Sequence, residues 1–139
     1  MTEFTGTSTP TSAASPTRFR SVLSLDEWRE IDETTGGEKN QKSEQYSLIP
    51  VPAFDMLARV YAYGAGKYDR NNWRRGYPWH LSFDAMMRHL NAFWNGEDLD
   101  PESGLPHVAH AMFHCATLLT FMQEYPEGDD RYVRTRTGN

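Results

Sequence analysis

The residues best suited to chemistry lie in one stretch, RHLNAFWNGEDLDPESGLPHVAHAMFHC, which spans residues 88–115. Its middle carries four carboxylates close together: Glu97, Asp98, Asp100 and Glu102. Three histidines follow at spacings that place them along one stripe of a helix: His107, His110 and His114. Carboxylates and imidazoles that converge in this way can hold a divalent metal ion.

Known metal motifs do not explain this stretch. Asp98, Asp100 and Glu102 resemble the opening of a calcium loop, but an EF-hand needs glycine at its sixth position and glutamate at its twelfth. Those positions hold Ser103 and Ala109, so the EF-hand interpretation fails. The sequence has no HExxH, so a zinc protease is unsupported. Acidic residues ahead of a helix also interact favourably with its dipole, which is a purely structural alternative.

A second group of residues, just upstream, suits a nucleotide. Four cations could neutralise phosphates: Lys67, Arg70, Arg74 and Arg75. Four aromatic residues among them could stack on a base: Tyr68, Trp73, Tyr77 and Trp79. The alternative is that Trp73 and Trp79 only pack this loop onto the helices. No glycine-rich phosphate loop and no Ser-His-Asp or Cys-His arrangement is visible, which disfavours covalent catalysis.

Three amphipathic helices are expected to position these groups. The first covers residues 52–64, with Pro52 in its first turn and with Gly64 and Gly66 ending it. No strand-like alternation of any length is present. The sequence therefore predicts an all-α fold, a small bundle of about three to four helices with a long aromatic and basic loop.

The second and third helices flank the acidic loop. The second is expected to have Ser82 as its N-cap and to run to about residue 95, and the third covers about 105–125. Spacing predicts an apolar face on the second helix: Phe83, Met86, Met87, Leu90, Phe93 and Trp94. It predicts a core face on the third, with the histidines at its edge: Val108, Ala111, Met112, Cys115, Leu118, Leu119 and Met122.

The whole chain has 139 residues, one cysteine and a formal net charge of −5, which indicates one small intracellular domain. We divide it into an N-terminal tail at 1–20, a helical domain at 21–125 and a polar C-terminal tail at 126–139. Residues 21–31 are expected to form a helical turn or two, or a packing arm.

Composition also sets expectations about location and partners. No apolar run suits a signal peptide or a membrane span, so we expect a cytoplasmic location. Net acidity argues against binding a nucleic acid duplex. The ordered part makes only a marginal core although Phe, Trp and Met are frequent, so we expect a homodimer or a dimer of dimers, oligomerising through helices.

Five segments form a long and specific set: TGGEKNQK, QYSLIP, YGAGKYDRNNWRRGYPW, RHLNAFWNGEDLDPESGLPHVAH and FHCATLL. Together, over about residues 34–121, they resemble the dATP/dGTP diphosphohydrolase N-terminal domain family, which is common in phage genomes. The resemblance implies an all-α fold similar to the MazG-like nucleotide pyrophosphohydrolases. Those enzymes oligomerise, bind Mg²⁺ or Mn²⁺ through helix-borne carboxylates, and hydrolyse nucleoside triphosphates to monophosphate and pyrophosphate.

The resemblance implies a role for each matching residue, with a purine deoxynucleoside triphosphate as substrate. Metal ligands are expected at Glu97, Asp100, Glu102 and His107. Activation of water is expected from Glu97 or His89. Binding of phosphates and base is expected from Lys67, Tyr68, Asn72, Trp73 and Arg88.

The sequence departs from the pattern in two ways. It lacks the ExxE…ExxD pattern of typical MazG enzymes, so their metal cage cannot simply be transferred. It also has Gln45 where relatives often carry a basic residue, so part of the phosphate-binding site is weakened or lost. A second hypothesis therefore stays open, in which a small oligomeric protein binds and sequesters a nucleotide without cleaving it.

Overall fold

The computed structural model describes residues 15–16, 29–40 and 42–133. Three helices dominate this part: α1 (Val51–Lys67), α2 (Trp79–Trp94) and α3 (His107–Glu124). The all-α prediction is confirmed, with the addition of one small two-stranded sheet. None of the helices in these ranges is long and apolar enough to cross a membrane. The expected tail at 1–20 and the expected turns at 21–31 lie almost wholly outside the described residues.

Each long helix begins directly after a proline with an extended backbone. Pro50, Pro78 and Pro106 are the N-caps of α1, α2 and α3, and none of them supplies a side-chain hydrogen bond. Proline lacks an N–H and has a fixed φ, so it suits a helix entry. The prediction of Ser82 as an N-cap is therefore wrong. Ser82 lies inside α2, 1% exposed, with its hydroxyl 2.8 Å from the Tyr77 hydroxyl.

Glycines end only some of these helices. The prediction that Gly64 and Gly66 end α1 is wrong, because the helix continues through both to Lys67. Glycine in a helix interior costs about 1 kcal/mol relative to alanine, which neighbouring contacts can offset. Gly96 does follow the end of α2 as expected, with a φ of 94° that favours glycine.

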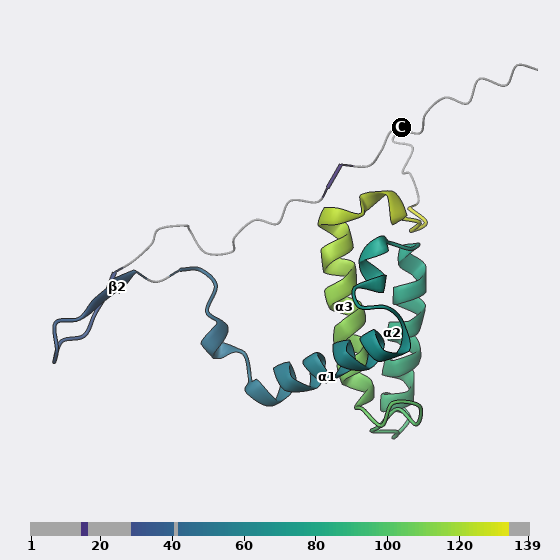
Figure 1. Cartoon of the computed structure of the whole chain (residues 1–139), viewed down its shortest axis with the longest axis horizontal. Coiled ribbons are helices and arrows are strands. Elements are labelled where there is room, and N and C mark those ends of the chain that lie inside the picture. Colours follow the sequence, from purple (N-terminus) through teal and green to yellow (C-terminus); the bar gives the residue numbers. More distant parts are fainter. Residues whose placement is uncertain (1–14, 17–28, 41, 134–139) are drawn as a thin grey trace, which may run out of the picture.

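Helices α2 and α3 form an antiparallel hairpin whose connection carries the acidic residues (Figure 1). Backbone hydrogen bonds fix this connection: the His107 N–H donates to the Asp98 carbonyl at 3.0 Å, and the Asp100 N–H donates to the Leu105 carbonyl at 2.8 Å. Gly104 turns the chain between them with a φ of 70°. The loop is thereby held against the start of α3.

The core side of α3 is its histidine side, and the face that spacing indicated is buried only in part: Ala111 is buried, and Leu118 and Met122 are partly exposed. The buried residues of this helix are His107, Ala109, His110, Ala111, Thr117 and Phe121. Residues from the predicted core face are instead exposed: Val108, Met112, Cys115 and Leu119. The prediction is wrong for these four because α3 is apolar on two sides, and α2 packs against the side that carries the histidines.

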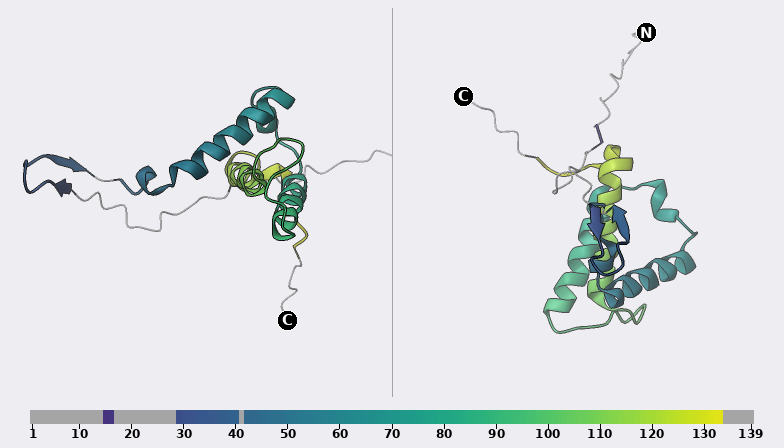
Figure 2. Two further views of the ribbon diagram at one scale, coloured as in Figure 1. Left: turned by 90° about the horizontal axis from the view of Figure 1, so that it is seen from below. Right: turned by 90° about the vertical axis from the view of Figure 1, so that its left-hand side faces the viewer.

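The C-terminal half of α1 packs across α3. The Tyr61 and Phe113 rings meet edge to face with centroids 4.8 Å apart, and Val60 is 3% exposed. The remaining part, residues 29–40 and 42–59, extends away from the three-helix body and is called the arm here (Figures 1 and 2). The arm exposes large apolar side chains: Tyr46, Leu48, Ile49, Val51 and Phe54.

A short hairpin ends the arm. Strand β1 (Arg29–Ile31) pairs antiparallel with β2 (Glu38–Asn40). The Asp32 carboxylate accepts hydrogen bonds from the N–H groups of Thr34 and Thr35, which closes the turn. These strands were not predicted, because the segment reads in the sequence only as a polar, glycine-containing connector.

The chain after α3 folds back onto the start of α2. The Trp79 indole N–H donates to the Tyr125 carbonyl at 3.0 Å, and the Asp130 carboxylate contacts His80. Pro126 is buried. The first part of the segment predicted as a loose polar tail is therefore packed, and Trp79 has the packing role considered as an alternative.

Candidate metal and nucleotide site

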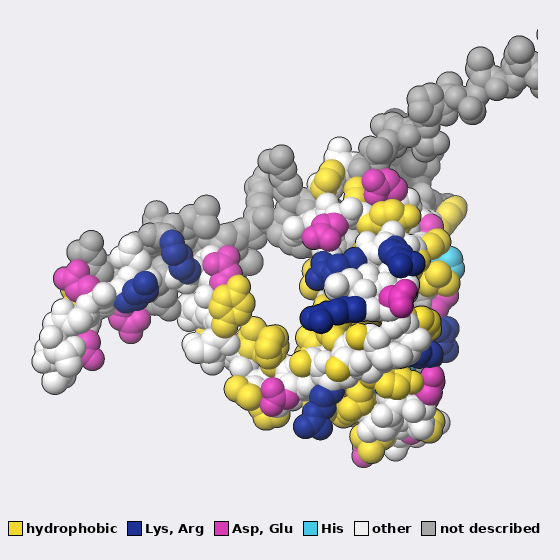
Figure 3. Space-filling model, in the orientation of Figure 1, with side chains coloured by type: hydrophobic (Ala, Val, Ile, Leu, Met, Phe, Trp, Pro, Cys, Tyr) yellow, Lys and Arg dark blue, Asp and Glu magenta, His cyan; other side chains and the backbone are white. Residues whose placement is uncertain are grey.

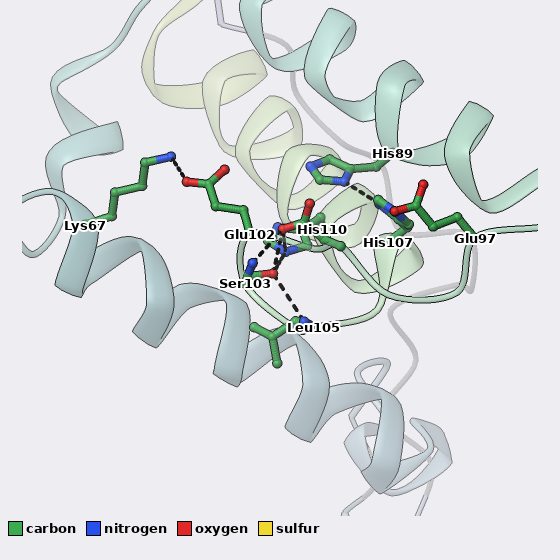
Figure 4. Close-up of polar contacts among 9 residues, drawn as sticks. Lys67, His89, Glu97, Glu102, Ser103, Leu105, His107 and His110 are labelled. Atoms are coloured by element: carbon green, nitrogen blue, oxygen red, sulfur yellow. Dashed lines mark hydrogen bonds and ion pairs between the residues drawn. The ribbon is translucent and has the colours of Figure 1, made fainter.

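Three side chains from three successive segments converge at the closed end of the α2–α3 hairpin (Figure 4). His89 comes from α2, Asp100 from the connecting loop, and His107 from the first turn of α3. One ligand atom of each lies within 4.8 Å of the others. The Nδ1 atoms of His89 and His107 are 2.9 Å apart. These three residues are called the His–Asp cluster below.

Ser103 fixes the carboxylate of the cluster. Asp100 Oδ2 accepts hydrogen bonds from the Ser103 N–H at 3.0 Å and from its hydroxyl at 2.7 Å. Because the hydroxyl proton of Ser103 is donated to Asp100, the Ser103 hydroxyl oxygen accepts the hydrogen bond from His110 Nε2, which is 2.7 Å away. Burial raises the pKa of Asp100, but the Ser103 hydrogen bonds outweigh it and keep the pKa below its usual value. The carboxylate is therefore charged at neutral pH.

The histidines beside it are neutral at the same pH. The His89 ring stacks on the His110 ring with centroids 4.5 Å apart and lies 6.1 Å from the His114 ring. Burial lowers the pKa of all three, assisted for His89 and His114 by neighbouring histidines, and it brings the pKa of His114 to about 4. Neutral imidazole is the form that binds metals.

His107 has a buried nitrogen without a hydrogen bond. The residue is 4% exposed and its Nε2 has no hydrogen-bond partner. Its nearest polar neighbour is Glu97 Oε1 at 3.5 Å, on a side chain that is 52% exposed. Leaving such a group unpaired costs about 1–3 kcal/mol. The neutral imidazole of His89, the charged carboxylate of Asp100 and this unsatisfied ring fit a divalent metal ion better than they fit a purely structural core.

A charged pair lies beside the cluster. Lys67 Nζ is 2.6 Å from Glu102 Oε1, with side chains 42% and 62% exposed (Figure 4). The hydrogen bonds from Lys67 and then Tyr63 lower the pKa of the Glu102 carboxyl. Lys67 is thus held at the end of α1 as a permanent cation close to the loop. A solvent-exposed pair of this kind is weak and can exchange partners.

A cleft of about 810 Å³ lies between α1, the loop after it, and α3. Its lining includes aromatic, amide and cationic groups: Tyr61, Tyr68, Arg70, Asn72, Trp73 and His114. His114 lies seven residues after His107, which is about 10 Å along a helix. His107 and His114 are therefore near opposite ends of one histidine row, while the ring of His89, the third residue of the cluster, lies 6.1 Å from the His114 ring at the cleft.

The structure regroups the predicted metal ligands. Asp100 and His107 come together as expected, and His89, predicted as a base, joins them. Glu97 lies at the rim beside His107, whereas Glu102 pairs with Lys67 and lies outside the cluster.

The predicted substrate residues fall into two places. Tyr68, Asn72 and Trp73 line the cleft, while Lys67 lies near the cluster. Arg88 is an exposed residue of α2 that directly precedes His89.

Two residues of the site were missed. His110 and Ser103 hold Asp100, yet neither was predicted as part of the site. The signal for His110 was present in its position on the histidine stripe. Nothing in the sequence pointed to Ser103, because a lone serine in a loop is common.

Comparisons with known proteins identify the family of this chain. A family model described as "dATP/dGTP diphosphohydrolase, N-terminal" matches residues 33–131. A protein of Salmonella phage PMBT28 named dATP/dGTP diphosphohydrolase is 35% identical over 97 residues, which cover 70% of this chain and 33% of that protein. This chain therefore spans about a third of the relative's length. No solved structure matches. From the family match and this relative, we conclude that the chain belongs to the dATP/dGTP diphosphohydrolase N-terminal family.

Proposed function

We propose that this chain carries the site of a metal-dependent deoxynucleoside triphosphate diphosphohydrolase. The reaction converts a purine deoxynucleoside triphosphate and water to the monophosphate and pyrophosphate. The observation that carries the proposal is the His–Asp cluster, which lies beside the Lys67–Glu102 pair and whose His89 ring is 6.1 Å from the ring of His114 in the lining of an aromatic cleft. A nucleoside in the cleft would extend its phosphates toward the cluster. The names of the family and of the phage relative support the same reaction.

Each residue has a distinct task in the proposed reaction. The His–Asp cluster would hold a divalent ion such as Mg²⁺ or Mn²⁺, which would supply Lewis acidity at the site. The exposed Glu97 carboxylate accepts a proton from the water molecule while the oxygen of that water attacks the α-phosphorus. The bond from that phosphorus to the bridging oxygen breaks, and pyrophosphate leaves with the electron pair.

Other residues bind the substrate without taking part in proton transfer. Lys67 exchanges its contact with Glu102 for phosphate oxygens and neutralises their charge, which is the main requirement of phosphoryl transfer. Tyr68, 58% exposed at the cleft, stacks on the purine. Trp73 packs against Tyr61 and Phe113, so it forms a fixed wall of the cleft.

The test is a product analysis with the full chain. The protein is incubated with each of the four deoxynucleoside triphosphates and MnCl₂, and ion-exchange chromatography separates monophosphate from diphosphate products. We expect monophosphate and pyrophosphate from dATP and dGTP, and a loss of at least about 100-fold in Glu97→Gln, which keeps an acceptor oxygen but not the base. Glu33→Gln, in the hairpin turn, is the matched control and should retain full rate.

The same experiment separates hydrolysis from sequestration. If the nucleotide is bound and then recovered intact after the protein is denatured, the chain is a nucleotide-binding protein and the proposed reaction is wrong. Diphosphate and free phosphate as products would also reject it, because a different bond would then be broken.

We further propose that copies of the chain associate into a dimer or tetramer through the arm. Apolar side chains follow the arm and continue across the adjoining face of the body (Figure 3). Leu48 is 75% exposed, Val51 68% and Phe54 60%. An apolar surface of this kind on a small domain is typical of a protein interface. A second copy would bury it and complete the marginal core.

A further inference from the structure

The two histidines of the His–Asp cluster face each other through the same ring nitrogen. Their Nδ1 atoms are 2.9 Å apart. Two imidazole nitrogens bound at about 2.1 Å to one ion, at right angles, would lie about 3.0 Å apart. The observed separation is therefore close to that of two ligands on one ion. Without an ion, only one of the two nitrogens can donate a proton to the other.

The outer nitrogen of His107 supports the same assignment. When the Nδ1 lone pair points into the cluster, Nε2 carries the proton, and this nitrogen lies 3.5 Å from Glu97 Oε1 without a hydrogen bond between them. A carboxylate opposite the outer N–H of a metal-binding histidine fixes the ring orientation and increases ligand basicity. The second oxygen of Glu97 remains available for the proton of a water molecule.

The carboxylate is held in a comparable way. Asp100 Oδ2 is used by the two hydrogen bonds from Ser103. Among the described residues, Asp100 Oδ1 accepts no hydrogen bond, so this oxygen is free to bind an ion. His107 and Asp100 thus each have one atom available for an ion, Nδ1 and Oδ1, and a second atom near a neighbouring side chain: Nε2 near Glu97 and Oδ2 hydrogen-bonded to Ser103.

The kinds of donor atom decide which ions fit. Mg²⁺ demands oxygen ligands in near-octahedral geometry and loses its water reluctantly. Imidazole favours the first-row transition metals, whose affinities rise from Mn²⁺ to Co²⁺ and beyond. Two of the three cluster ligands are imidazoles, and the remaining coordination positions are left for water or phosphate oxygens.

We infer that the His–Asp cluster is a two-histidine, one-carboxylate site that selects transition-metal ions over Mg²⁺. The role of the ion in hydrolysis rests on the proposed function, but its selection can be measured by binding alone. Of the two expected ions, Mg²⁺ and Mn²⁺, such a site favours Mn²⁺, and it also suits the heavier first-row transition-metal ions.

The experiment titrates the chelator-treated full chain with CoCl₂, MnCl₂ and MgCl₂ by calorimetry, without nucleotide. We expect Co²⁺ to bind more tightly than Mn²⁺, and Mg²⁺ to bind at least about tenfold more weakly than Mn²⁺. His89→Asn should weaken Co²⁺ binding at least about tenfold. His80→Asn is the matched control on the same helix and should bind Co²⁺ like the unmodified chain, because His80 faces Asp130.

A second measurement avoids dependence on the folding of a variant. The visible absorption bands of Co²⁺ bound to the unmodified chain should differ from those of hydrated Co²⁺, because imidazole nitrogens replace water as ligands. Mg²⁺ binding as tight as that of Co²⁺, or unchanged Co²⁺ affinity in folded His89→Asn, overturns the inference. Pyrophosphate release with either result would still support the proposed function, whereas tight Co²⁺ binding without hydrolysis would reject only that function.

Discussion

Replacing His114 by asparagine tests how the histidine row is kept neutral. His114 Nδ1 is 3.2 Å from the Ser82 hydroxyl, and the ring lies between the cleft and His89. Burial, with smaller contributions from His89, His110 and Arg88, lowers its pKa from 6.5 to about 4. Asparagine can place a polar atom near the position of Nδ1 but cannot take up a proton.

The sign and size of the effect follow from proton binding. Between pH 6.5 and about 4 the unfolded chain holds a proton on His114 and the folded protein does not. The free energy of unfolding therefore rises with pH in this window. The stability associated with the neutral His114 ring is fully present above pH 6.5 and is lost as the pH falls toward 4. A separation of this size corresponds to at most about 3 kcal/mol, and solvent screening of the partly exposed ring reduces it to about 1–2 kcal/mol.

The assay is urea denaturation with a metal chelator present, at pH 8 and at pH 5. The unmodified chain should lose about 1 kcal/mol more than His114→Asn between these two conditions. Any general destabilisation by the smaller side chain affects both pH values and cancels in this comparison. His89 and His110 contribute the pH dependence that remains in the variant, because burial lowers the pKa of each of them too. An identical pH dependence in both proteins would refute the reasoning.

Two further predictions concern the core and the arm. Phe121→Ala should lower the free energy of unfolding by about 3–5 kcal/mol in urea titrations, because the ring is 2% exposed. Leu119→Ala, on the same helix but 54% exposed, should cost less than about 1 kcal/mol, and equal losses would contradict this account of the core. Phe54→Asp should reduce the mass measured by light scattering to that of one chain, with an unchanged circular dichroism spectrum. A mass that stays oligomeric in this variant would exclude the arm as the interface.

The three helices could be predicted because each is long and periodic, but the start of α2 and the end of α1 could not. Ser82 is a good N-cap by residue type, yet Pro78 starts α2 four residues earlier and leaves Ser82 as a buried polar link to His114. The spacing of apolar residues along α3 also did not identify which side of this helix is buried. His110 and His114 can turn toward the interior because Ser103 and Ser82 contact them, and those serines come from other segments.

The candidate site was partly predictable for the opposite reason, since its members are close in sequence. Asp100 and His107 stand on either side of one short turn, so their residue types already indicated a metal site. The exchange of roles between His89 and Glu102 was not predictable. It depends on α1 crossing α3, which brings Lys67 within 2.6 Å of Glu102 and removes that carboxylate from the cluster.

The short connection between α2 and α3 also bears on how the protein folds. The facing nitrogens of His89 and His107 are separated by 18 positions in the chain, and Asp100 lies between them. Contacts of such short range form early and quickly, because little loop entropy is lost in making them. The ion-binding group can therefore assemble with the helical hairpin alone, before α1 docks. If the transition-metal ion proposed above bound at that stage, it would stabilise the hairpin before the rest of the body forms.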